Sequence, residues 1–163
     1  MHFVYDWSGG LSLVAVVAPV NESIAEHLKL IFYPMIIYFV VVYFIKVDKC
    51  AISAGKWFFS LLVSTITGML AVCLLYYFYI GAFGVNIDFI NIGIYYVSVI
   101  LGLSSGASVY GKAKNISPFI SIFILLIIAF ALTYFTYYPP ALPIFMDPVS
   151  KKYGIEVFIY SSF

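Results

Sequence analysis

Four long apolar runs constrain the fold of this chain more than any other feature. They cover approximately residues 28–45, 57–79, 89–110 and 119–138. A helix of about 20 apolar residues crosses the roughly 30 Å hydrocarbon layer of a bilayer. Helices are favoured there because they satisfy their backbone hydrogen bonds internally. The sequence therefore predicts an all-α fold, a polytopic transmembrane helical bundle with four spans, in a single membrane domain over residues 1–163.

The composition excludes a soluble domain and a nucleic-acid-binding protein. Only 9% of the residues are charged, whereas 64% are hydrophobic, so the charged side chains are too few to cover a water-facing surface. The formal net charge is only +1, and no basic stripe is present to neutralise phosphates. We therefore expect the lipid bilayer as a partner and no nucleic acid.

The lysines predict an orientation in the cell membrane. The loops over residues 46–56 and 111–118 carry lysines, whereas the loop over residues 80–88 has none. Lysine-rich loops remain on the cytoplasmic side. The first span then runs from outside to inside, and the Pro-rich tail over residues 139–163 is extracytoplasmic.

Two shorter features add to this outline. Residues 11–20 are apolar but too few to span, and Pro19 closes the run, which predicts a short N-terminal re-entrant or interfacial helix. Small residues recur every four positions on the second and third spans, as Ser60, Ser64, Gly68 and as Ser98, Gly102, Gly106. Such faces let helices approach closely. We expect the two spans to pack on each other, with a homodimer seam as the alternative.

The residues from Asn21 to Lys29 concentrate ionisable groups at the start of the first span. Asn21 is expected to cap a helix, with Glu22 in its first turn. In one interpretation Glu26 simply pairs with Lys29 at the surface, and His27 lies at the membrane interface. In the other, the cluster is functional, because charge near hydrocarbon is costly and is kept where it is used.

The predicted topology brings further polar groups to the same outer face. Glu26, His27 and Asp147 are the catalytic candidates, although Asp147 before Pro148 equally predicts a turn. Zinc or another divalent metal is a possible cofactor, with His27, Glu22, Glu26 and His2 as its candidate ligands. The spacing is not diagnostic of a metal site. The candidate binding residues are His2, Tyr5, Asp6, Trp7, Asn21, Glu22, Ser23, Lys29 and Tyr153.

Three classes of function remain open from the residues alone. The first is an outward-facing polar site that binds a metal, a lipid or a small molecule, or that performs metal-assisted hydrolysis. The second is a small transporter or channel subunit whose carboxylates bind a coupling proton or cation. The third is a non-catalytic membrane assembly partner. Whether the protein is an enzyme is left undecided by these patterns.

Motifs at both ends of the chain identify a family. They are H-F-V-Y-D-W-S-G-G from His2, N-E-S-I-A-E-H-L-K from Asn21, and P-P-A-L-P-I-F-M-D-P from Pro139 followed by Y-G-I from Tyr153. Together they resemble an uncharacterised family of small bacterial membrane proteins, a domain of unknown function. The resemblance implies no known activity. Similar proteins have Glu in place of Asp6 and a further transmembrane helix before the first motif, so five spans are expected in a full-length relative.

Overall fold

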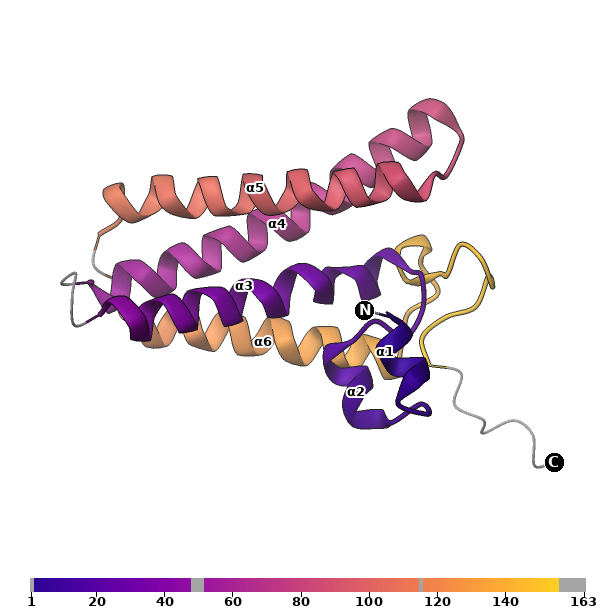
Figure 1. Cartoon of the computed structure of the whole chain (residues 1–163), viewed down its shortest axis with the longest axis horizontal. Coiled ribbons are helices and arrows are strands. Elements are labelled where there is room, and N and C mark those ends of the chain that lie inside the picture. The colour runs from indigo at the N-terminus through magenta and orange to yellow at the C-terminus, as the bar shows by residue number, and fades with distance from the viewer. Residues whose placement is uncertain (1, 48–51, 115, 156–163) are drawn as a thin grey trace. The chain divides into compact units, whose positions relative to one another are not determined.

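The computed structural model describes residues 2–47, 52–114 and 116–155, without the side chains of His2 and Phe3 (Figure 1). The described residues form an all-helical protein. The α-helices are α1 (His2–Trp7), α2 (Ser12–Val17), α3 (Ile24–Lys46), α4 (Ala54–Phe83), α5 (Asp88–Lys112) and α6 (Pro118–Tyr137), and a 3₁₀ helix η1 (Pro143–Phe145) follows. The predicted short helix over residues 11–20 corresponds to α2, and α1 is a further helix before it; Gly9 and Gly10, both with positive φ, separate the two.

Helices α3 to α6 are each long and apolar enough to cross a membrane. The four predicted spans coincide with these helices, with ends that differ by a few residues. Helix α4 is the longest, at 30 residues. It ends where Gly84 adopts a left-handed conformation with φ of 67° and donates its N–H to the Ile80 carbonyl. Glycine is favoured at this position because it has no Cβ to clash.

The chain divides into two compact units. We call residues 1–30 and 127–163 the terminal unit and residues 31–126 the central unit. Helices α3 and α6 each contribute to both units.

In the central unit, α4 and α5 run along each other (Figure 1). Their small-residue faces meet, as predicted. A Cβ on Gly102 would lie 2.6 Å from the Ser64 carbonyl oxygen, and one on Gly106 would lie 2.8 Å from the Ser60 carbonyl oxygen. Only glycine permits such an approach of two helix backbones. Both faces therefore meet within the chain, and the alternative of a homodimer seam stays a prediction.

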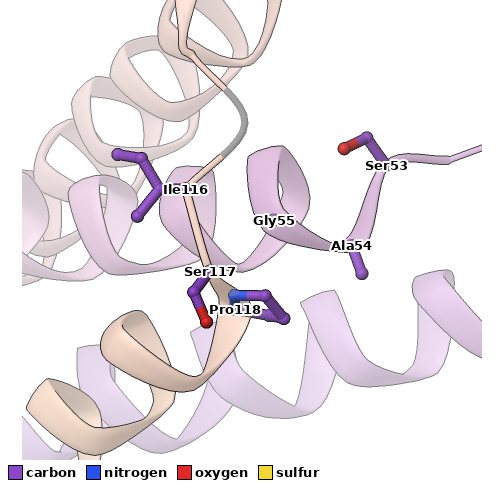
Figure 2. A pocket seen from close by; sticks show the side chains of 6 residues that line it. All are labelled: Ser53, Ala54, Gly55, Ile116, Ser117 and Pro118. Atoms are coloured by element: carbon purple, nitrogen blue, oxygen red, sulfur yellow. The ribbon is translucent and has the colours of Figure 1, made fainter.

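Helix α3 packs on α4 within the central unit through Phe39 and Trp57. The Trp57 indole N–H donates to the Phe39 carbonyl at 3.0 Å, and their rings lie 5.1 Å apart. The same unit has an open pocket of about 440 Å³ beside the first turn of α4 and the chain leading into α6 (Figure 2). Its lining residues are Ser53, Ala54, Gly55, Ile116, Ser117 and Pro118. None of them is ionisable, so the pocket offers no acid, base or charged ligand-binding group.

In the terminal unit, the C-terminal segment folds back onto the end of α6. The rings of Phe135 and Phe145 lie 5.1 Å apart, and the Ile155 N–H donates to the Thr136 carbonyl at 3.1 Å. A β-bridge pairs Met146 with Tyr153 around a tight loop. The terminal unit therefore combines α1, α2, the first turns of α3, the last turns of α6 and this returning segment.

Candidate functional site

Ser23, not Asn21, caps helix α3. The Ser23 hydroxyl accepts the Glu26 N–H at 3.4 Å, and the Ser23 carbonyl accepts the His27 N–H at 3.1 Å. These bonds place Ser23 at the N-cap. Asn21 lies two residues earlier, where its side-chain oxygen accepts the Ser23 N–H at 2.9 Å. The prediction that Asn21 begins the helix, with Glu22 in the first turn, was wrong because Asn21 forms an Asx turn instead.

Glu26 and Lys29 form a buried ion pair. The Lys29 ammonium nitrogen (Nζ) lies 2.8 Å from Glu26 Oε2, and the two side chains are 0% and 6% exposed. The interpretation of this pair as a surface contact was therefore wrong. An ion pair at this spacing on an exposed helix contributes little to the free energy of unfolding. A buried pair holds two charges away from water, so its stability depends on the additional hydrogen bonds that the two groups make.

Those additional hydrogen bonds come from three other parts of the terminal unit. The Thr136 hydroxyl of α6 donates to Glu26 Oε1 at 2.7 Å, and the Val20 N–H donates to Glu26 Oε2 at 3.0 Å. Lys29 also donates to the Ala15 carbonyl of α2 at 2.7 Å. We call these five residues the buried cluster. It ties α2 and α6 to the start of α3 through charged hydrogen bonds.

The N-terminal and C-terminal motifs of the chain meet beside this cluster. The Asn21 side-chain amide donates to the Gly154 carbonyl at 3.1 Å, across 133 residues of sequence. Gly154 has a φ of 61°, and a Cβ there would lie 2.7 Å from both the Thr136 carbonyl oxygen and Pro139 Cγ. Glycine is required at this position both by its backbone conformation and by the space available. The returning segment is thus held against α6 and against the chain that leads into α3.

Asp147 holds the C-terminal loop. Its carboxylate accepts the Val149 N–H at 2.7 Å and the Ser150 hydroxyl at 2.8 Å. Burial raises the pKa of Asp147, but hydrogen bonds from Val149, Ser150 and the backbone N–H of Glu22 outweigh it and lower the pKa below its usual value. The turn prediction for Asp147 is confirmed. The Glu22 bond also places this loop next to the motif that begins at Asn21.

Glu22 and His27 form a partly exposed pair. His27 Nε2 lies 3.6 Å from Glu22 Oε2, and the side chains are 29% and 39% exposed. His27 Nδ1 lies 2.8 Å from the Ser23 carbonyl, which can only accept, so Nδ1 carries a proton. Nε2 is then an acceptor in the neutral ring and becomes a donor toward Glu22 when the ring is protonated. The pair therefore offers a carboxylate beside a group that can accept or donate.

Helix α1 carries the remaining N-terminal candidates. Tyr5 is partly buried, and its pKa is raised by burial and by the neighbouring Tyr137 and Asp6. Asp6 and Trp7 are exposed. The side chain of His2 lies outside the described residues, so its predicted role as a ligand stays a prediction. Tyr153, at the other end, contributes its backbone to the bridge with Met146 and exposes its ring.

Among the described side chains, no group of three or more His, Cys, Asp or Glu residues lies close enough to hold a metal ion. Glu26 already receives three donors in the buried cluster, and Asp147 receives its donors from its own loop and from Glu22. Of the predicted ligands whose side chains are described, only Glu22 and His27 present donor atoms together at a partly exposed position. Two donors are fewer than a closed protein zinc site uses.

Sequence reasoning missed several residues that hold the site. Thr136 lies in an apolar run, and Ala15 and Val20 contribute only backbone groups. A threonine near the C-terminal end of α6 was the one available signal, because a hydroxyl in an apolar run usually has a hydrogen-bond partner.

The described residues form an all-helical protein whose four long helices are compatible, by length and composition, with a multi-pass membrane protein. The chain belongs to the family of unknown function DUF6512, whose model matches residues 1–155. The matched residues include the motifs at both ends of the chain. No curated protein and no solved structure matches the chain.

Proposed function

We propose that the protein is an integral membrane binding protein whose outward-facing terminal unit binds a small polar ligand or a lipid head group through Glu22 and His27. The observation that supports this is the contrast within the terminal motifs. Glu26, Lys29, Asn21 and Asp147 have hydrogen bonds that join elements of the unit, whereas Glu22 and His27 face each other with 39% and 29% of their side chains exposed.

The chemistry of the pair defines the ligand class. The Glu22 carboxylate attracts a cationic or hydrogen-bond-donating group, and neutral His27 adds an acceptor at Nε2. An ammonium group, on a zwitterionic phospholipid head group or on a free amine, satisfies both. The buried cluster acts as the support, because it fixes the start of α3 on which His27 lies.

Binding to purified protein tests this proposal. Native mass spectrometry would compare phosphatidylethanolamine, which carries an ammonium, with phosphatidylglycerol, which has none. Ethanolamine alone is the probe for a free amine. We expect preferential binding of the ammonium-bearing probes, weakened about 10- to 100-fold in Glu22→Gln, since a charged hydrogen bond contributes about 1.5–3 kcal/mol. His27→Ala should weaken binding in the same direction.

Asp88→Asn is the control, because Asp88 is an exposed acid at the start of α5, in the central unit and outside the proposed site. It should leave binding unchanged. Equal binding of all probes by the native protein and by both variants refutes the proposal. Stoichiometric Zn²⁺ that is lost in His27→Ala would instead assign the pair to a metal. Proton- or sodium-coupled uptake in proteoliposomes would favour a transporter.

A further inference from the structure

Helix α2 turns two of its apolar side chains, those of Leu13 and Val17, away from the protein. Leu13 is 84% exposed and Val17 is 47% exposed, whereas Ala15 is fully buried. At 3.6 residues per turn, positions 13 and 17 share one face and position 15 lies on the opposite one. Leu11, just before the helix, is also exposed. The buried face thus carries an alanine and the exposed face carries Leu13 and Val17, while Val14 and Val16 are half-buried.

Two hydrogen bonds fasten α2 to the ends of the long helices. The Ala15 carbonyl accepts from Lys29, in the second turn of α3, at 2.7 Å. The Ser12 carbonyl accepts from the Tyr137 hydroxyl, in the last turn of α6, at 2.8 Å. Both α3 and α6 are candidate membrane spans. Helix α2 therefore lies at the level where two spans begin and end.

The length of α2 and the composition of residues 4–20 indicate where α2 lies in the membrane. Six residues of helix are about 9 Å long, roughly a third of the hydrocarbon thickness, so α2 does not reach the bilayer centre and return. Asp6 is the single acid or base among residues 4–20. Trp7, in α1, is 82% exposed. Exposed tryptophan and leucine beside the end of a span are typical of the boundary between head groups and acyl chains.

We infer that the exposed apolar surface formed by Trp7, Leu11, Leu13 and Val17 contacts lipid at this boundary, which makes α2 an interfacial helix and not a re-entrant one. The occupant is lipid because α2 is hydrogen-bonded to the last turn of α6, a helix on which the exposed side chains of Phe130 and Tyr134 would face acyl chains. This inference rests on the membrane placement proposed above and is independent of ligand binding at Glu22 and His27.

Tryptophan fluorescence with brominated phospholipids tests the lipid contact. Trp57→Phe leaves Trp7 as the single native tryptophan, because the chain has two. In phosphatidylcholine vesicles, we expect Trp7 to be quenched more by bromines near the head group than by bromines near the chain ends. Quenching by aqueous acrylamide, with none by either bromolipid, overturns the inference for Trp7.

Leu13→Trp in the Trp7→Phe, Trp57→Phe background tests α2 itself. Val149→Trp in the same background is the control, because Val149 is similarly exposed, at 78%, but lies in the C-terminal loop. We expect bromolipid quenching for Leu13→Trp and acrylamide quenching for Val149→Trp. Acrylamide quenching of both overturns the inference. Shielding of Leu13→Trp from both quenchers also overturns it, since a second copy or another protein then covers the face.

A variant in α4 separates failure of this inference from failure of the proposed membrane placement. Leu74→Trp replaces an exposed leucine of a candidate span and should be quenched by bromines in the acyl chains. If Leu74→Trp is quenched and Leu13→Trp is not, the interfacial inference fails and the membrane placement stands. If Leu74→Trp is not quenched, the proposed membrane placement of the spans fails, and the interfacial inference fails with it. Size-exclusion chromatography and far-UV circular dichroism confirm that each variant is folded.

Discussion

Replacement of Lys29 by methionine should destabilise the terminal unit strongly. The variant removes the counterion of Glu26, whose side chain is only 6% exposed, and leaves the Ala15 carbonyl without its donor. Breaking a buried ion pair on one side costs about 3–5 kcal/mol, because a charge remains buried without compensation. Glu26→Gln should cost a similar amount, since it leaves the ammonium of Lys29 buried.

The double variant Glu26→Gln, Lys29→Met should be more stable than either single variant. It has no buried charge, the single amide oxygen of the glutamine can still accept the Val20 N–H, and the Thr136 hydroxyl keeps its bond to the Leu132 carbonyl. The remaining cost is the unsatisfied Ala15 carbonyl, about 1–3 kcal/mol. A double-mutant cycle therefore gives a coupling energy of several kcal/mol. Equilibrium unfolding in mixed micelles with increasing SDS, followed by far-UV circular dichroism, measures all four free energies.

Glu22→Gln is the control, because Glu22 pairs with His27 at a partly exposed position. Its effect on stability should stay within about 0.5 kcal/mol. If the costs of the two single variants simply add in the double variant, Glu26 and Lys29 do not act as a pair. Loss of less than about 1 kcal/mol in Lys29→Met would contradict the burial of an uncompensated charge.

Three further outcomes follow from the same structure. Gly102→Ala should cost about 1–3 kcal/mol, because a Cβ there would lie 2.6 Å from a backbone oxygen of α4, whereas Gly93→Ala, with nothing within 4 Å, should not destabilise. Gly154→Ala should reduce thermal stability, because φ is 61° and its Cβ would contact backbone. Asp147 contributes stability above its usual pKa that is lost as the pH falls through its lowered folded value, so Asp147→Asn should reduce the acid dependence of unfolding.

The long helices followed directly from local composition, but their ends did not. Apolar runs identify spans because the bilayer acts on about 20 residues at once. The start of α3 was misplaced because Asn21 and Ser23 are both good capping residues. The Asx turn at Asn21 and its bond to Gly154 decide between them, and that bond spans 133 residues.

The candidate site was predictable as a set of residues but not as an arrangement. Because charged residues are rare in this chain and costly near hydrocarbon, the sequence correctly marked the segment that holds Glu26 and Lys29 as unusual. Their burial depends on Thr136, which lies far away in the sequence, and on the backbone groups of Val20 and Ala15. Every residue type has such backbone groups, so the sequence does not indicate which ones will bind. The separation of Glu26 from the exposed Glu22–His27 pair could not be read from spacing, because Glu22 lies outside the helix.

Local sequence patterns are enough to predict an all-helical chain with four membrane-compatible helices, a close α4–α5 contact through small residues, and two polar motifs at its ends. These properties arise from neighbours within one or two helical turns. Which charges are buried and which are accessible depends instead on the tertiary structure. That distinction depends on whether residues from α2, α6 and the returning C-terminal segment supply hydrogen bonds to Glu26, Lys29 and Asn21, since a charge is buried only where distant groups replace water.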